Sequence, residues 1–208
     1  MSLAHSVSRY NRRRKWNIFL EAFRINPAAK ILDAGFSDAE YSKTDNFLEK
    51  NYPYPENITA LGLVEPVSFN KRYPWVQTIK YNGHLFPFSG KEFDICWSNA
   101  VLEHVGGKQE QTQFLKEIAR VADVAFITTP NRFFPIEVHT RIPLLHFLPK
   151  RFFDVCLRLL GKTWATGNYM NLLSLVELNK LLDAAGIKKY QIKENKLLGF
   201  TLDFVIIL

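Results

Sequence analysis

Residues 86–105 read FPFSGKEFDICWSNAVLEHV and carry the most informative pattern of the chain. Residues 93–97 within it form a short apolar run, which is typical of a strand buried on both faces of a sheet. The polar residues Ser98 and Asn99 follow directly, and a helix-like turn with a Glu-His pair comes next. An open parallel sheet binds its ligand at the carboxyl ends of its strands, so this stretch predicts both a strand and part of a site.

The rest of the chain alternates predicted strands with helical segments. The predicted strands are 30–35, 58–64, 76–81, 93–97, 124–127, 187–192 and 200–207, and the predicted helices are 8–25, 45–51, 109–121 and 174–185. Strands separated by helix-length segments indicate an α/β fold with a mostly parallel sheet and covered faces. The last two strands lie close enough in the sequence to pair as an antiparallel hairpin.

Length and composition favour one globular domain over residues 1–208. Hydrophobic residues make up 47% of the chain and charged residues 23%, which is the balance of a folded protein. We expect this domain to carry an N-terminal amphipathic helix at 8–25 and an inserted apolar segment at 131–173. No apolar run approaches the roughly 20 residues of a membrane span, and no apolar stretch follows the basic cluster at 12–15 as in a secretory signal. We therefore expect a cytoplasmic protein.

The cysteine count and the net charge exclude some classes and leave others open. Cys96 and Cys156 lie in apolar segments, and neither their number nor their spacing supports a disulfide framework or a zinc site. The formal net charge of +7 would attract nucleic acid, anionic lipid or a phosphorylated substrate, although most such charge is simply a solvated face.

A second motif precedes the first. Residues 31–35 read ILDAG, an apparent strand that ends in an acid and a glycine. Together with residues 86–105, this pattern resembles the class I S-adenosylmethionine (SAM)-dependent methyltransferases over residues 30–130. The resemblance implies a Rossmann-like, seven-stranded, mostly parallel sheet with a C-terminal antiparallel hairpin strand and helices on both faces. It also implies SAM as the methyl donor and catalysis mostly by positioning a nucleophile in line with the methyl group.

The resemblance assigns cofactor-binding roles to residues at the ends of the first four strands. Those after the first strand would meet the amino-acid part of SAM, the acid after the second the ribose, those after the third the adenine, and those after the fourth the methionine part. In that order they are Asp33, Gly35 and Ser37; Glu65; Asn82 and Gly83; and Ser98, Asn99 and Ala100.

The chain departs from the family pattern after the first and the third strand. The family usually has an acid-x-Gly-x-Gly-x-Gly motif, but Ser37 and Ala39 stand where the second and third glycines belong. Asn82 replaces the usual adenine-binding Asp, although its carbonyl can still accept a hydrogen bond. These departures motivate an alternative function, a degenerate methyltransferase fold that acts as a non-catalytic binding or scaffold module.

The candidates for acceptor chemistry lie after the fourth and fifth strands. His104 and His139 are candidate catalytic bases because an unperturbed imidazole titrates close to working pH, and Arg132, His139 and Arg141 are candidate substrate-reading groups. Each also has a structural interpretation, as a helix-start contact for His104 and as salt-bridged loop residues for the others. Residues 142–160 form either a lid over an apolar substrate, an interfacial helix on anionic lipid, or a core-packing insertion.

Competing enzyme classes lack their motifs. A nicotinamide dehydrogenase needs G-x-G-x-x-G directly after the first strand, and no such run is present. The residues after the fourth strand, 99–102, read NAVL, without the Pro-Pro-aromatic sequence of methyltransferases that act on DNA base amines. We therefore expect a SAM-dependent methyltransferase with a small-molecule or lipid-like acceptor, without a metal or a nucleic-acid partner, and with peripheral membrane contact left open.

Overall fold

The computed structural model of the protein describes residues 3–24, 26–136, 142–167 and 170–208. Seven strands of this described part form one sheet in the order β3-β2-β1-β4-β5-β7-β6. They are β1 (Ile31–Ala34), β2 (Ile58–Gly62), β3 (Gln77–Lys80), β4 (Phe93–Asn99), β5 (Ala122–Pro130), β6 (Gln191–Leu197) and β7 (Phe200–Ile207). Strands β1 to β5 pair in parallel, whereas β7 is antiparallel to both β5 and β6. The predicted Rossmann-like sheet with its antiparallel C-terminal hairpin is confirmed.

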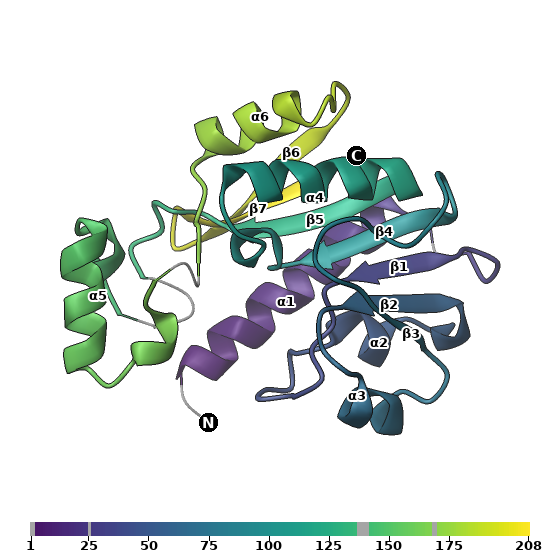
Figure 1. Cartoon of the computed structure of the whole chain (residues 1–208), viewed down its shortest axis with the longest axis horizontal. Helices are drawn as coiled ribbons and strands as arrows, with labels where there is room; N and C mark the ends of the chain where they lie inside the picture. The colour runs from purple at the N-terminus through teal and green to yellow at the C-terminus, as the bar shows by residue number, and fades with distance from the viewer. Residues whose placement is uncertain (1–2, 25, 137–141, 168–169) are drawn as a thin grey trace.

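Helices cover both faces of this sheet (Figure 1). They are α1 (Leu3–Ala22), α2 (Phe47–Asn51), α3 (Val67–Arg72), α4 (Lys108–Val121), α5 (Lys150–Leu159) and α6 (Leu175–Ala184). Because side chains of a strand alternate between faces, neighbouring residues of β1 enter different cores. Leu32 belongs to the core that α4 and α6 cover, and Ile31 belongs to the core under α1, α2 and α3. Helix α5 stands apart from the sheet, beyond the carboxyl ends of the parallel strands (Figure 1).

Aromatic side chains fix α1 against the middle of the sheet. The ring of Phe19 lies 5.1 Å from that of Trp97 on β4 and 5.5 Å from that of Phe126 on β5, centroid to centroid. Trp97 and Phe126 stack on each other at 4.9 Å, and Trp16 stacks on Phe19 at 5.2 Å. Such aromatic pairs add to the stabilisation from apolar burial, so this cluster sets where the N-terminal half of α1 crosses the sheet edge.

Several elements differ from the sequence prediction: α1 (Leu3–Ala22) lies earlier than the predicted 8–25, and β5 (Ala122–Pro130) is longer than the predicted 124–127. For three other elements the structure gives a physical reason. Strand β4 continues past residue 97 because its pairing with β5 continues to Asn99, opposite Thr128. Strand β6 begins only at Gln191, since the backbone at Ile187 still hydrogen-bonds the end of α6 at 3.0 Å. Helix α3 was not predicted at all. Its first N–H groups are capped from far along the chain by Asp38, whose Oδ1 accepts from Ser68 N and Phe69 N at 2.7 and 2.8 Å.

Among the residues that the structure describes, none of the helices combines the length and the apolar character that a membrane-spanning segment needs.

Truncating the central aromatic ring tests the packing of α1. Phe19 is only 1% exposed, so we expect Phe19→Ala to lower the free energy of unfolding by about 3–5 kcal/mol through lost burial and an unfilled cavity. Denaturant unfolding measures it. The matched control is Leu20→Ala, at the neighbouring, 37% exposed position, which should change stability by no more than about 1 kcal/mol. Equal effects of the two substitutions would contradict this account of α1.

Candidate functional site

A cleft of about 960 Å³ lies at the carboxyl ends of β1 and β4. Helix α1 closes one side of it with Ser8, Arg12 and Lys15, and the loop between β1 and α2 closes another. Of the predicted site residues, the structure brings six to this cleft: Asp33, Gly35, Ser37, Asn99, Ala100 and His104. The position agrees with the rule that open α/β sheets bind ligands outside the carboxyl ends of their strands.

Gly35 is a glycine for two structural reasons. Its φ of +123° lies in a region that side chains disfavour, and a Cβ there would stand 2.4 Å from the nearest methyl carbon of Val101. Its backbone N–H donates to the carbonyl of Leu61 on β2 at 2.9 Å, which fixes the turn. Ser37 and Ala39, by contrast, are not among the described residues with a positive φ. The backbone therefore requires a glycine at the first position of the motif and not at the next two.

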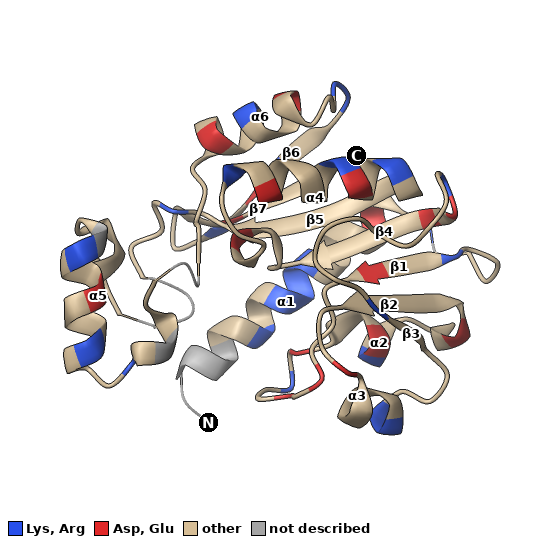
Figure 2. Ribbon diagram, in the orientation of Figure 1, with Lys and Arg blue, Asp and Glu red and all other residues tan. Residues whose placement is uncertain are grey.

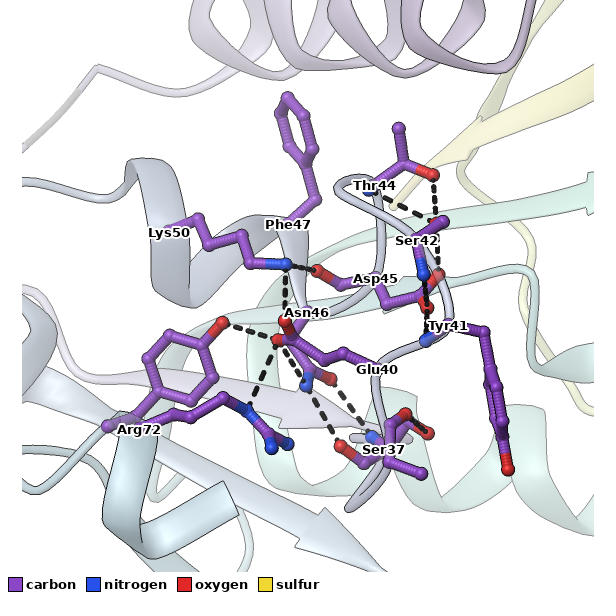
Figure 3. A network of polar contacts seen from close by, with 12 residues as sticks. Ser37, Glu40, Tyr41, Ser42, Thr44, Asp45, Asn46, Phe47, Lys50 and Arg72 are labelled. Atoms are coloured by element: carbon purple, nitrogen blue, oxygen red, sulfur yellow. Dashed lines mark hydrogen bonds and ion pairs between the residues drawn. The ribbon is translucent and has the colours of Figure 1, made fainter. Parts of the chain in front are cut away.

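Side-chain hydrogen bonds hold the loop that follows Gly35 (Figure 3). Asn46 accepts from the Ser37 backbone N–H at 3.0 Å and donates to its carbonyl at 2.8 Å. Glu40 forms an ion pair with Lys50 at 2.8 Å and accepts from the hydroxyl of Tyr73 at 2.5 Å. The Ser37 hydroxyl donates to the Ala39 carbonyl at 2.7 Å. The loop is thus shaped by polar side chains where the related motif uses glycines.

Two buried carboxyl groups meet on the wall of the cleft. Asp33 is 5% exposed and Glu49, on α2, is 6% exposed, and both side chains line the cleft. Burial raises the pKa of Asp33 well above its ordinary value, and the charge of Glu49 raises it further. Burial likewise raises the pKa of Glu49. Both shifts favour a proton on this pair, because two adjacent buried charges of one sign repel.

Glu49 has a further property that distinguishes it. Both of its carboxylate oxygens are buried, and apart from Asp33 no donor among the described residues reaches either of them. A buried carboxylate ordinarily has several hydrogen-bond or ionic partners, because losing its hydration is costly. The Asp33–Glu49 pair is thus suited to receive a cationic donor from the cleft.

Cationic residues of α1 line the same cleft. Figure 2 shows blue segments along that helix. Lys15 is 3% exposed and lies 3.1 Å from a carboxylate oxygen of Asp203 on β7. It also donates to Thr128 at 3.3 Å and to the side-chain carbonyl of Asn99 at 3.5 Å. Burial lowers the pKa of Lys15, and the charge of Asp203 opposes that shift. Lys15 is therefore already matched by a carboxylate.

Arg12 lies one helical turn before Trp16 and also lines the cleft. Burial lowers the pKa of its guanidinium, and the nearby charges of Asp203 and Asp45 act in the opposite direction. A guanidinium remains charged at any working pH and can hold a carboxylate or phosphate through two parallel hydrogen bonds. Arg12 is thus the cleft residue best suited to an anionic group of a ligand.

The two residues of the Glu-His pair after β4, Glu103 and His104, have different roles. Glu103 is completely buried, and its carboxylate accepts from the hydroxyl of Thr129 on β5 at 3.1 Å. Its carbonyl accepts from the backbone N–H of Asn171 at 2.7 Å, so Glu103 ties this turn to the chain before α6. His104 is partly exposed and lines the cleft, with its Nε2 4.0 Å from the Glu103 carboxylate. The structure thus gives Glu103 a packing role and leaves the imidazole facing the cleft.

Three predicted residues lie on an exposed shoulder at the ends of β2 and β3. Glu65 forms an ion pair with Lys80 at 2.6 Å, and Asn82 accepts from the His84 backbone N–H at 3.1 Å. A Cβ at Gly83, whose φ is +86°, would lie 3.4 Å from the side chain of Leu63, which is itself 59% exposed. Because β2 is the neighbour of β1, this shoulder adjoins the strand end that carries Gly35. Residues 63–65 and 82–83 form this shoulder.

The remaining predicted residues fall elsewhere. Ser98 is fully buried and donates to the Ala34 carbonyl at 3.1 Å, beneath the cleft. Arg132 is exposed, forms an ion pair with Glu177 at 3.5 Å, and lines a second hollow of about 320 Å³ together with His146. His139 and Arg141 lie outside the described residues.

The cleft residues that had not been predicted include Lys15, Asp203, Arg12 and Glu49, and the sequence signals these four unequally. Lys15 lies four positions before the buried Phe19 and therefore on the same helix face, which is a readable signal. Asp203 is an acid inside an apolar strand, which is also informative. Arg12 stands in a run of basic residues that conceals it, and nothing local distinguishes Glu49. Within the described residues, no three His, Cys, Asp or Glu side chains are grouped as a metal site requires.

Comparisons with known proteins agree with this arrangement. The profile of the methyltransferase-domain family matches residues 46–124. A SAM-dependent methyltransferase from Aquifex aeolicus superposes with a TM-score of 0.58 at 15% identity, over 93% of this chain and 87% of that one. One from Methanosarcina mazei gives 0.56 at 18% identity, over 91% and 95%. The cyclase SpnF also superposes, at 0.54 and 13% identity, over 88% and 59%. No curated protein matches the chain by sequence.

The chain has the fold of the class I SAM-dependent methyltransferases, and the resemblance seen in its sequence is confirmed by the family profile and by the fold.

The carboxyl pair makes stability depend on pH. Since the folded pKa values of Asp33 and Glu49 are raised, the folded chain binds protons that the unfolded chain has released, so stability falls as pH rises. We expect the fall to begin near the ordinary Asp value of 3.8 and to continue through the raised folded pKa. Glu49→Gln should make the free energy of unfolding depend less on pH. The reduction is about 1.4 kcal/mol for each pKa unit of difference between the folded and the unfolded state that the substitution removes. Chemical denaturation between about pH 4 and about pH 9 measures this dependence.

The control for this titration is Glu21→Gln, an exposed site on α1. It should leave the pH dependence of wild type unchanged. If Glu49→Gln also leaves the slope unchanged, the two carboxyls do not share a proton in the folded protein.

Proposed function

We propose that this chain is a SAM-dependent methyltransferase that acts on a small-molecule or lipid-like acceptor. The observation that carries the proposal is the buried Asp33–Glu49 pair beside Gly35, at the carboxyl edge of a methyltransferase-fold sheet. Within the described part of the chain no cationic donor reaches the Glu49 oxygens of this pair, and the methionine part of SAM carries an ammonium group. A charge-assisted hydrogen bond in a low-dielectric cleft is about twice as strong as a neutral one.

The other contacts of the cofactor follow from the charges around the cleft. Arg12 is the partner for the α-carboxylate of the methionine part, because Lys15 is already paired with Asp203. The shoulder would take the nucleoside: Glu65 accepts from the ribose hydroxyls, and Leu63 with Gly83 leaves an apolar platform for the adenine. Gly35 lets the backbone approach the ligand closely between these two regions.

The bound cofactor would supply an electrophilic methyl group on a sulfonium that leaves readily. The chain then has two tasks, which are to hold the acceptor in line with that methyl group and to remove a proton from its nucleophilic atom. His104 is the proposed base for the second task, because it faces the cleft and is oriented next to the buried Glu103. An acceptor oxygen or nitrogen within hydrogen-bond distance of its imidazole would give up its proton to a ring nitrogen of His104.

The acceptor is proposed to enter from the side of the second hollow. Apolar side chains of Leu148, Phe153 and Leu173 line this hollow beside Arg132. Apolar walls with a few fixed polar groups are typical of sites for small molecules and lipid-like molecules.

One observation favours the alternative of a non-catalytic binding or scaffold module. The side-chain carbonyl of Asn99, a predicted cofactor contact, already accepts from Lys15 and from Thr128, the latter at 2.8 Å. A cofactor that used this oxygen would have to displace one of them. Cofactor binding therefore separates the two functions.

The first test is calorimetric titration with S-adenosylhomocysteine, the product form of the cofactor. We expect saturable binding that releases protons, because the ammonium group of the ligand replaces the proton on the Asp33–Glu49 pair. Affinity should therefore rise with pH. Two buffers of different ionisation enthalpy measure the number of protons released. Asp33→Asn and Glu49→Gln should each weaken binding about 10- to 100-fold. Absence of binding by wild type up to millimolar ligand would contradict the cofactor proposal and favour the scaffold module.

A second test separates the shoulder from the cleft. Glu65→Ala should weaken binding of the same ligand by about 1–3 kcal/mol, because two ribose hydroxyls lose a charged acceptor, with little effect on folding. The control is Glu56→Ala, an exposed acid before β2. Unchanged affinity of Glu65→Ala, together with a loss in Asp33→Asn, would place the ribose elsewhere while leaving the ammonium site intact.

A further inference from the structure

Residues 142–167, here called the α5 lobe, form a small unit outside the main sheet. It contains α5 and the short 3-10 turns Leu145–Phe147 and Thr163–Ala165. Phe153 and Leu157 of α5 pack with Ala165 into a core separate from the two that line the sheet. Figure 1 shows α5 beyond the carboxyl ends of the parallel strands, the same edge at which the cleft lies. One face of α5 is therefore accounted for by its own core.

A second face of α5 is apolar and exposed. Phe152, Val155 and Leu159 are 64%, 50% and 82% exposed, and their spacing of three and four residues places them on one helical stripe. Leu160 and Leu148 at the two ends of the helix are 57% and 43% exposed. Single exposed hydrophobic residues need no explanation, but an uninterrupted stripe of large ones marks an interaction surface.

Cations accompany this stripe. Arg151 and Arg158 are exposed on α5, and Lys162 follows the helix. Figure 2 shows blue and red segments on α5, and Asp154 is the one acid in the sequence of that helix. The Asp154 carboxylate accepts from the Gly167 backbone N–H at 3.4 Å and so faces the turn at the end of the lobe. The charge beside the apolar stripe is therefore mainly positive, in a chain of net charge +7.

We propose that the exposed face of α5 docks on an anionic lipid bilayer. A helix whose apolar stripe is flanked by arginines lies in the plane of a membrane interface, with large side chains among the acyl chains and guanidinium groups on lipid phosphates. A second copy of the chain would bring the same arginines face to face, which like charges oppose, whereas an anionic surface complements them. When the α5 lobe is docked, the carboxyl edge of the sheet, with the cleft and the second hollow, lies close to the lipid. The proposal stands apart from the methyltransferase function, since docking needs no cofactor.

The test is co-sedimentation of the full chain with vesicles of equal parts phosphatidylglycerol and phosphatidylcholine, and with vesicles of phosphatidylcholine alone. We expect binding to the anionic vesicles that weakens with salt. The double variants Phe152→Ser/Leu159→Ser and Arg151→Glu/Arg158→Glu should each reduce partitioning at least about tenfold. Circular dichroism and thermal unfolding verify that each variant is folded.

Matched controls distinguish vesicle binding by this face of α5 from non-specific hydrophobic or electrostatic binding. Leu198→Ser/Phe200→Ser removes two apolar residues that are 90% and 56% exposed on the β6–β7 hairpin, and Lys188→Glu/Lys189→Glu reverses two charges after α6. Both should bind vesicles within about twofold of wild type if the α5 face is specific. The proposal is overturned if wild type does not bind anionic vesicles, or if the controls lose as much as the α5 variants. It is also overturned if light scattering shows a dimer that Phe152→Ser/Leu159→Ser dissociates without any vesicle binding.

Discussion

The candidate site depends on the packing of α1 across the sheet. The contact of Phe19 with Trp97 and Phe126 buries the C-terminal part of the helix, and the residues one and two turns earlier are thereby positioned over the carboxyl edge. Arg12 and Lys15 are positioned in the cleft by this contact, not by local loop structure. Burying Lys15 is costly unless a carboxylate accompanies it, and Asp203 of β7 supplies that charge. The C-terminal hairpin therefore stabilises the site that the N-terminal helix covers.

The electrostatics of the cleft are asymmetric as a result. Lys15 and Asp203 neutralise each other on the side of β7, whereas burial raises the pKa values of Asp33 and Glu49 on the side of α2 and favours their protonation. Arg12 lines the same cleft, where burial lowers the pKa of its guanidinium and the surrounding carboxylates oppose that shift. A zwitterionic ligand, with an ammonium and a carboxylate on one carbon, matches a carboxyl pair next to a guanidinium. That match is a property of side chains from α1, β1 and α2 together.

Sequence reasoning found the sheet because buried strands appear as apolar runs, as at β4 and β7. It found Gly35 because a strand that ends in an acid and a glycine matches the family motif, and the structure explains that glycine by its positive φ and its close approach to Val101. It missed α3, whose N-terminus is capped by the remote Asp38, and it missed Glu49, whose neighbour Asp33 lies far along the chain. Features determined by residues close in the sequence could be predicted, and features determined by tertiary contacts could not.

The absence of glycines at Ser37 and Ala39 matters less for the observed backbone than the sequence motif suggests. A glycine motif matters where the backbone needs positive φ or where a side chain would collide, and Ser37 and Ala39 show no positive φ. The left-handed position in this loop belongs instead to Asn46, at φ 45°, a residue type that tolerates that conformation, and its side chain bonds both backbone groups of Ser37. The loop therefore reaches a defined shape without those glycines. Since the cyclase SpnF shares the fold, what the chain does with that shape is decided by the cleft side chains.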